Sequence, residues 1–193
     1  MTARYSTTRI DLGTGDGRFV LAAAAAEPDR LVIGVDADAT SMAEASRRAA
    51  GRPKRGGLPN ALFVVATAEA LPRELDGLAD ALTVQFPWGS LLRGLLRANS
   101  AVLGGLVRVT RPGAEVTLLL SVTERDHAMG LPPLDAQGIA ALAPAYAVHG
   151  LEMVDVRPAG PDDLARTHLT WARRIGAGRL RPAWLARFRR AGR

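Results

Sequence analysis

Three glycines within five residues, Gly13, Gly15 and Gly17, separate an apolar strand pattern that ends at Ile10–Asp11 from an alanine-rich segment, residues 18–26. The alanine-rich segment has the composition of a helix, and Pro28 stops it. A chain that passes from strand to helix here must turn sharply and let a ligand approach its backbone, and glycine permits both. The free N–H groups of the first helical turn add a positive dipole end. The loop therefore predicts an α/β fold with a ligand at the end of its first strand.

Two classes of cofactor use such a loop. The dinucleotide fingerprint G-x-G-x-x-G would place its third glycine at position 18, which is Arg18 here. Asp11 precedes the loop, and a carboxylate there would repel a pyrophosphate but can pair with the cationic amino group of a methionine moiety. Asp36 ends the next apolar segment, where its carboxylate can accept both hydroxyls of a ribose. The pattern favours S-adenosylmethionine, with a purely structural turn as the alternative.

Apolar runs alternate with helical patterns along the rest of the chain, which predicts a mainly parallel sheet. With this cofactor, we expect the Rossmann-like class I methyltransferase fold, a seven-stranded α/β sheet with helices on both faces. The remaining strands are expected at 31–36, 62–66, 81–86, 115–120, 151–156 and 184–190. Helices are expected from Ser41, with Ser41-x-x-Glu44 as a capping box, to Gly51, over 90–109 with a break near Asn99, and over 135–148. A turn is expected at Arg111–Gly113.

The bulk composition excludes several classes of protein. There are no cysteines, so disulfides and thiolate metal sites are excluded, and the three histidines have no ligand spacing. We therefore expect no metal. No apolar run approaches the roughly 20 residues of a membrane span, and the N-terminus lacks a secretory signal. Since no repeat or linker interrupts residues 1–193, we expect a single domain that is cytoplasmic, monomeric and free of membrane contact.

The net charge of +6 is unevenly distributed. Residues 47–55 carry five cations and no acid, and residues 166–193 carry nine arginines and no acid. Codon bias can explain why 24 of the 25 cations are arginine, but it does not explain why acids are missing from these two stretches. Two acid-free basic surfaces favour binding to a nucleic acid, because neutralised phosphates release counterions.

Two tryptophans lie in informative surroundings. The fourth strand pattern ends in Phe86-Pro-Trp-Gly89, and ligands bind at the carboxyl edge of a parallel sheet, so Trp88 is expected to face the reactive end of the cofactor. A tryptophan in the core or at its rim is the alternative. Trp171 lies among arginines, a composition that stacks bases and binds phosphates.

In this order, Asp11–Gly17, Thr67-Ala-Glu-Ala-Leu-Pro72, Phe86–Gly89 and Trp171–Arg179 resemble the Kam/Npm-type aminoglycoside-resistance methyltransferases. The resemblance covers about Ile10 to Arg181. It implies methylation of N1 of adenosine-1408 in 16S rRNA, at the helix 44 decoding site of the 30S ribosomal subunit. Two features depart from the family: only ten residues precede Asp11, and Leu169 stands where members tend to have a hydroxyl residue.

The resemblance also implies roles for individual residues. The cofactor would be held at its methionine end by Asp11, Gly13 and Gly15, at its ribose by Asp36, and at its adenine by Thr67, Ala68 and Glu69, with Ser90 beside the transferred methyl group. The flipped adenine would stack between Trp88 and Trp171, with the Pro87 carbonyl near its exocyclic amine. The rRNA would be contacted by Arg47, Arg48, Arg52, Arg174, Arg179 and Arg181.

Three other functions remain open at this point. A methyltransferase for a small molecule would be expected to have an apolar lid and no paired basic stretches. A second alternative is a tRNA methyltransferase that acts on guanosine N7. Only the sequence around the two tryptophans favours the ribosome over tRNA as the substrate. A binding protein that uses the loop as a scaffold would not need both Asp11 and Asp36.

Overall fold

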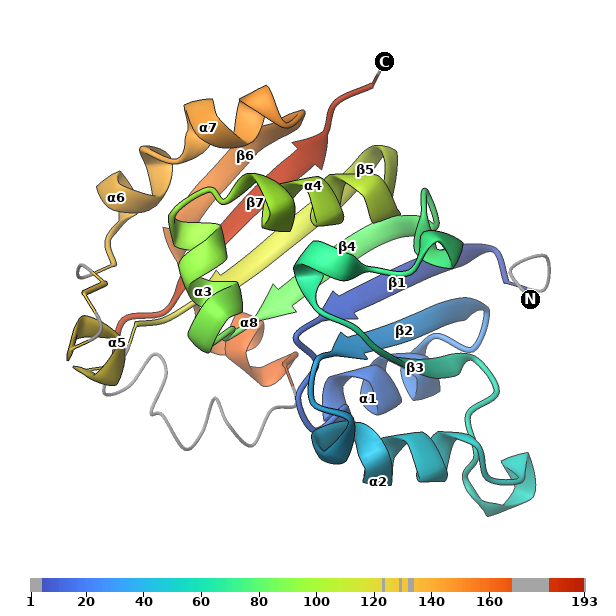
Figure 1. Ribbon diagram of the computed structural model, residues 1–193. Helices are drawn as coiled ribbons and strands as arrows, with labels where there is room; N and C mark the ends of the chain where they lie inside the picture. The colour runs from blue at the N-terminus through green and yellow to red at the C-terminus, as the bar shows by residue number, and fades with distance from the viewer. Residues whose placement is uncertain (1–4, 123, 129, 132–133, 168–180, 193) are drawn as a thin grey trace.

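In the computed structural model, residues 5–122, 124–128, 130–131, 134–167 and 181–192 are described. Within them, one sheet has the strand order β3-β2-β1-β4-β5-β7-β6 (Figure 1). Its strands are β1 (Thr7–Leu12), β2 (Arg30–Asp36), β3 (Ala61–Val65), β4 (Ala79–Gln85), β5 (Thr110–Leu120), β6 (Leu151–Pro158) and β7 (Trp184–Arg190). β1 to β5 are parallel, and β7 runs antiparallel between β5 and β6. The predicted seven-stranded, mainly parallel sheet is confirmed.

Helices lie on both faces of this sheet (Figure 1). They are α1 (Arg18–Ala26), α2 (Ala39–Ala49), α3 (Gly89–Leu96), α4 (Ser100–Val109), α5 (Glu124–Ala128), α6 (Ala136–Ala140), α7 (Ala143–Val148) and α8 (Pro161–Ala165). The described residues also form 3-10 turns at η2 (Pro53–Arg55), η3 (Ala68–Ala70) and η4 (Arg73–Leu75). In the part of the chain that the structure describes, no helix has the length and apolarity that crossing a membrane requires.

The two faces have separate apolar cores, because successive strand residues point to opposite sides of a sheet. Val32 of β2 packs with Phe19 of α1 and Ala49 of α2. Its neighbour Ile33 belongs to the larger core on the other face, which contains Leu92 of α3 and the buried positions of α4, α6 and α7. The helices after β1 and β2 thus cover one face, and those after β4 and β5 cover the other.

Tyr146 of α7 closes the larger core. Its side chain is fully buried, its ring stacks on Phe188 of β7 with centroids 4.6 Å apart, and its hydroxyl donates to the Leu95 carbonyl at 3.0 Å. The hydroxyl therefore has a partner although it is buried, which avoids a desolvation penalty of about 1–3 kcal/mol. This contact fixes the end of α3 relative to β7.

The predicted capping box of the second helix is wrong. α2 begins at Ala39, and Asp38 is its N-cap, with an extended backbone and a carboxylate that accepts from the Thr40 N–H at 2.9 Å. Ser41 lies inside the first turn, and its hydroxyl donates to the Asp38 carbonyl at 2.9 Å instead of capping. The side chain of Glu44 is used elsewhere, in an ion pair with Arg47.

Three other boundaries also differ from the prediction. The helix expected to end at Gly51 ends at Ala49. The expected turn at Arg111–Gly113 lies inside β5, which begins at Thr110 because Thr110 pairs with Ala79 before an irregularity in the register. The expected helix over 135–148 is divided into α6 and α7. The break near Asn99 and the final strand at 184–190 are confirmed.

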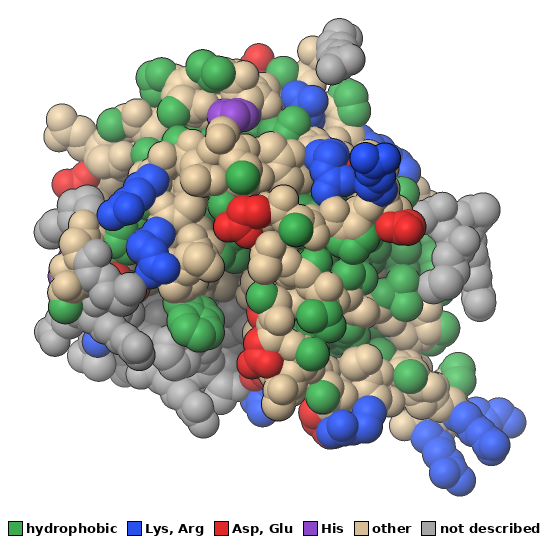
Figure 2. Space-filling model, viewed as in Figure 1, with side chains coloured by type: hydrophobic (Ala, Val, Ile, Leu, Met, Phe, Trp, Pro, Cys, Tyr) green, Lys and Arg blue, Asp and Glu red, His purple; other side chains and the backbone are tan. Residues whose placement is uncertain are grey.

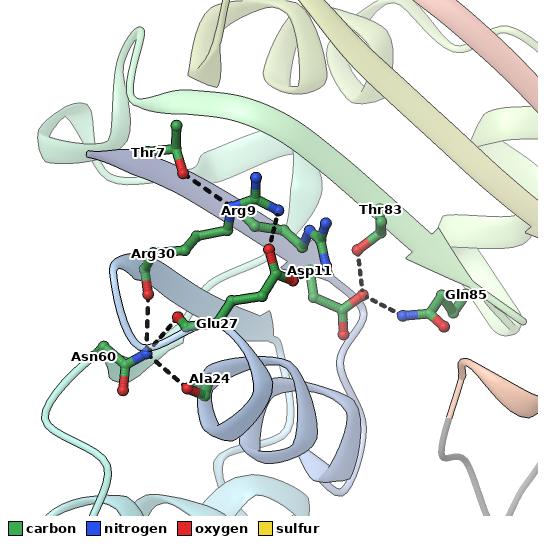
Figure 3. Close-up of polar contacts among 9 residues, drawn as sticks. All are labelled: Thr7, Arg9, Asp11, Ala24, Glu27, Arg30, Asn60, Thr83 and Gln85. Carbon is green, nitrogen blue, oxygen red and sulfur yellow. Dashed lines mark hydrogen bonds and ion pairs between the residues drawn. The ribbon is translucent and has the colours of Figure 1, made fainter. Parts of the chain in front are cut away.

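Asn60 joins three elements at the amino end of the sheet. The Asn60 side chain is buried, and its amide hydrogens are shared among the carbonyls of Ala24, Glu27 and Arg30 at 2.9, 3.1 and 3.0 Å (Figure 3). These carbonyls lie near the end of α1, in the turn that follows and at the start of β2. We expect Asn60→Ala to lower stability by about 2 kcal/mol, because it removes a buried side-chain donor that these three carbonyls share.

Thermal unfolding measures this effect against a matched substitution. For a chain of this size, about 2 kcal/mol corresponds to a fall in Tm of roughly 4–8 °C. Asn99→Ala removes an exposed N-cap of α4, which accepts from the Ala101 and Val102 N–H groups, and should lower stability by about 1 kcal/mol. If Asn60→Ala lowers Tm by no more than Asn99→Ala does, the proposed stabilising role of the buried Asn60 side chain is wrong.

Candidate cofactor and base site

The glycine-rich loop has the backbone that its sequence predicts. Gly13, Gly15 and Gly17 have φ values of 74°, 57° and 69°, in the left-handed region that favours glycine. A Cβ atom would lie 2.8 Å from Leu91 at Gly13 and 2.6 Å from Phe63 at Gly17, whereas at Gly15 it would meet no atom within 4 Å. The outer two glycines thus let the loop pack closely, and the central one leaves open space above its backbone.

Asp36 holds this loop in place from the end of β2. One carboxylate oxygen accepts from the Gly15 N–H at 2.8 Å and the other from the Asp38 N–H at 2.9 Å. Ser41 adds a second tie, because its hydroxyl contacts the Gly15 carbonyl at 3.1 Å. Each carboxylate oxygen has a further lone pair, so Asp36 can still accept from ligand hydroxyls. Contacts within the protein therefore hold the loop against Asp36 and Ser41.

Asp11 lies beside the loop with only 2% of its surface exposed. Thr83 and Gln85 of β4 donate to one of its carboxylate oxygens at 2.8 and 3.0 Å (Figure 3). Burial raises the pKa of Asp11, and these hydrogen bonds oppose the rise. No ion pair neutralises Asp11 among the described residues. A buried carboxylate in this state is suited to a cationic group on a ligand.

Sequence reasoning missed Thr83 and Gln85. Their signal is visible in the sequence as two polar residues at alternate positions of the otherwise apolar segment 81–86. It gains meaning only from the register, in which Thr83 lies opposite Asp11 on the neighbouring parallel strand. Both are positioning residues, because they act through the Asp11 carboxylate.

The segment predicted to surround an adenine follows β3. Thr67 and Glu69 are exposed and Ala68 is buried, at the start of η3. A Cβ at Gly105 of α4 would lie 1.9 Å from the Ala68 carbonyl, so only glycine allows α4 to approach this turn so closely. The Ala66 N–H donates to the Asp36 carbonyl at 3.0 Å, which holds the segment next to Asp36.

Trp88 projects from a strained turn at the end of β4. Phe86 has φ 46°, in the left-handed region that a bulky residue rarely adopts, and its N–H donates to the Leu119 carbonyl at 2.7 Å. The Phe86 ring is buried in a small apolar cluster, and Pro87 is buried beside it. Trp88 itself is 73% exposed, which excludes the core tryptophan. Strain of this kind is usually retained where a side chain must be presented.

The sheet brings these segments together at one edge. The loop after β1, Asp36, the Thr67 segment and the Phe86–Ser90 turn all follow the carboxyl ends of strands that are neighbours in the order β3-β2-β1-β4. The strand order reverses between β1 and β4, which is where α/β sheets bind their ligands. Ser90 is exposed in the first turn of α3, one strand away from Asp11.

The geometry fits S-adenosylmethionine at three points. The buried carboxylate of Asp11, which has no ion pair among the described residues, suits the amino group of the methionine moiety. The open space at Gly15 allows the ligand to lie on the loop, and Asp36 has acceptor capacity for the ribose. The donor set therefore matches the cofactor that the sequence predicts.

The first basic segment lies at the opposite edge of the sheet. Arg47 and Arg48 end α2, and Arg52 precedes η2, before the chain enters β3. These side chains are exposed, as are Lys54 and Arg55, and Figure 2 shows cationic side chains at the corner where η2 lies in Figure 1. Arg47 also pairs with Glu44 at 2.7 Å, but both are exposed and the pair is weak. The structure thus separates these arginines from Trp88.

Half of the second basic segment, residues 166–193, lies outside the described residues. Trp171, Arg174 and Arg179 belong to residues 168–180, which are not among the described residues. Arg181 directly follows this segment and is half-buried. The segment follows α8, which is anchored to β6 by two hydrogen bonds from Arg157 to Asp163, at 2.6 and 2.9 Å. These hydrogen bonds hold the pKa of Asp163 below its usual value.

The sheet order and the ligand edge are those of a class I, Rossmann-like methyltransferase, and solved structures agree. A methyltransferase from Catenulisporales acidiphilia, a variant crystallised with its cosubstrate SAM, superposes with a TM-score of 0.90 at 33% identity, covering 99% of this chain and 88% of that one. The 16S rRNA methyltransferase KamB gives 0.88 at 35% identity, covering 98% and 90%.

Sequence comparison defines the family more narrowly. The family model for 16S rRNA (adenine(1408)-N(1))-methyltransferases matches residues 1–189. The enzyme of that name from Streptoalloteichus tenebrarius is 39% identical in an alignment 189 residues long that covers 94% of this chain and 86% of the relative. This chain belongs to the 16S rRNA (adenine(1408)-N(1))-methyltransferase family, which confirms the resemblance noted from its motifs.

Proposed function

We propose that this protein transfers the methyl group of S-adenosylmethionine to N1 of adenosine-1408 in 16S rRNA and thereby protects a cell against kanamycin and apramycin. The proposed substrate is the 30S subunit, at the helix 44 decoding site, and the acting unit is one copy of the chain. Family membership supports the reaction and the rRNA. The observation that carries the proposal is the exposed Trp88 at the cofactor edge, where a base can reach the methyl group.

The chemistry requires positioning more than reactive side chains. S-adenosylmethionine supplies a methyl group on a positively charged sulfur. Adenine N1 has an in-plane lone pair that forms the new N–C bond while the C–S bond breaks and its electrons stay on sulfur. Asp11, Asp36 and the Thr67 segment fix the cofactor, and the Pro87 carbonyl is assigned to the exocyclic amine. Alignment of this kind can supply several kcal/mol of the barrier.

Trp88 has a second task, because N1 is inaccessible inside a helix. Flipping the base out costs a few kcal/mol. Stacking on an aromatic side chain returns about 1–3 kcal/mol, and an aromatic face also favours the positive charge that develops on the ring. Trp171, from the acid-free segment at 166–193, is assigned to the second face of the base.

Primer extension on purified 30S subunits tests the assignment. After incubation with this protein and S-adenosylmethionine, reverse transcriptase is expected to stop at adenosine-1408, because N1 methylation blocks pairing. Subunits incubated without S-adenosylmethionine are the control. Expression in a susceptible bacterium should raise resistance to both drugs. Methyl transfer to tRNA with no stop at adenosine-1408 would refute the target in favour of a tRNA methyltransferase.

A further inference from the structure

The outer side of α3 carries three polar residues. Ser90 is assigned to the methyl-transfer site, but Arg93 and Arg97 have no role in that site. Leu92 and Leu95 are buried and turn one side of the helix toward the sheet. Ser90, Arg93 and Arg97 are spaced by three and four residues, so they lie together on the remaining side. We refer to Ser90, Arg93 and Arg97 as the α3 stripe. It begins at the residue assigned to the methyl-transfer site and continues as cations.

The two arginines of the stripe are free of protein partners. Among the described residues, neither Arg93 nor Arg97 has an ion pair or a side-chain hydrogen bond. They belong to a stretch, residues 86–114, without any Asp or Glu. The other arginines of that stretch, Arg108 and Arg111, are both paired with aspartates. Charge therefore remains uncompensated only at the end of the stretch that is next to Trp88.

The stripe is close to the base site. Trp88 is the N-cap of α3, so at a rise of about 1.5 Å per residue Arg93 lies about 8 Å and Arg97 about 14 Å farther along the axis. Figure 2 shows cationic side chains along α3 on the surface that faces the viewer. A nucleic acid strand that delivers a base to Trp88 has phosphates within this range on either side of the base.

We propose that the α3 stripe is an RNA-binding surface separate from the two basic segments, on which Arg93 and Arg97 bind phosphates of the rRNA strand that carries the target adenosine. The proposal rests on the proposed function, since it needs the rRNA as substrate. Charge complementarity favours RNA: arginine forms bidentate bonds to phosphate, and an acid-free surface does not repel a polyanion. Because Ser90 belongs both to the stripe and to the assigned methyl-transfer site, phosphates bound by the two arginines lie near the target base.

Binding to 30S subunits at several salt concentrations tests the proposal. Arg93→Gln and Arg97→Gln should each weaken binding by about 5-fold or more at 100 mM salt. The double variant should also flatten the slope of log affinity against log salt by about 1.5, because each lost phosphate contact contributes about 0.7–0.9. Arg73→Gln is the matched control, because Arg73 is exposed in η4, outside the site, and carries the same charge. Tm and affinity for S-adenosylmethionine should not change in any variant.

Three outcomes overturn the proposal in distinguishable ways. If the unaltered protein fails to bind and methylate the 30S subunit, the proposed function fails with it. If the unaltered protein binds, but both α3 variants bind as tightly as Arg73→Gln, the stripe alone is wrong. If affinity falls while hydroxyl-radical protection of the rRNA backbone stays the same in the double variant, the arginines contact a ribosomal protein and the assignment to RNA is wrong.

Discussion

Trp88→Ala is expected to lower methylation of the 30S subunit by about 10- to 100-fold, the loss of one stacking face at roughly 1–3 kcal/mol. Since Trp88 is 73% exposed and its side chain makes no hydrogen bond among the described residues, Tm should stay within about 1 °C of the unaltered protein. The strained Phe86 backbone that carries the turn is untouched by the substitution. Affinity for S-adenosylmethionine should likewise stay the same, because Asp11 and Asp36 are unchanged.

Single-turnover methylation and calorimetric titration of the cofactor separate these effects. Trp88→Phe is the matched variant, because it keeps an aromatic face at the same place and should retain most of the activity. Val148→Ala removes another highly exposed apolar side chain, on α7, and should have no effect. Full activity of Trp88→Ala would refute the stacking role, and a parallel loss of cofactor binding would show that Trp88 belongs to the cofactor site instead.

Asp11→Asn is expected to lower affinity for S-adenosylmethionine by about 10-fold or more, because a neutral amide loses the charge-assisted hydrogen bond to the methionine amino group. S-adenosylhomocysteine is a useful second ligand, since it keeps the amino group but lacks the charge on sulfur. If Asp11 binds the amino group, affinity for both ligands should fall by the same factor. A fall confined to S-adenosylmethionine would place Asp11 against the sulfur instead.

The same substitution should not destabilise the ligand-free protein at neutral pH. Burial raises the pKa of Asp11, so the folded state takes up a proton more readily than the unfolded state. The contribution of Asp11 to the free energy of unfolding is therefore fully present below the pKa that Asp11 has in the unfolded state. This contribution is lost as pH rises through the pKa of Asp11 in the folded state. The Asn side chain has no such cost and can still accept from Thr83 and Gln85.

Urea unfolding of both proteins from pH 8 to pH 4 checks the sign. The unaltered protein should gain stability relative to Asp11→Asn as pH falls through the raised pKa of Asp11. Asp11→Ala is the control for packing, since it leaves a cavity and removes the acceptor, and it should be less stable at every pH. If Asp11→Asn is as unstable as Asp11→Ala throughout, the carboxylate stabilises the fold and its cost has been misjudged.

The sequence predicted features that depend on neighbouring residues. The glycine loop and the helix at Arg18–Ala26 follow from local composition, and the parallel sheet follows from alternating patterns. The cap of α2 was mispredicted, because Asp38 and Ser41 both suit an N-cap and only the backbone decides between them. The single domain over residues 1–193 and the roles of the individual site residues stay predictions.

Features that depend on distant residues could not be predicted. Thr83 and Gln85 reach Asp11 across more than 70 residues of chain, and their role depends on the register of β1 against β4. The close contact of Gly105 with Ala68 has no local signal, because a glycine inside a helix usually indicates only reduced helix propensity. Such contacts are set by packing after the sheet has formed.

The length of α2 has a consequence for the size of the substrate. Its eleven residues, about 16 Å of helix, carry the chain from the cofactor edge of the sheet to the edge where Arg52 lies. An RNA that binds at both edges must extend around the protein, and the two contacts then reinforce each other as linked binding sites do. A short RNA that carries only the target adenosine occupies one of them and loses this avidity. If both edges bind rRNA as proposed, the intact subunit should therefore bind more tightly than a short RNA that carries only the target adenosine.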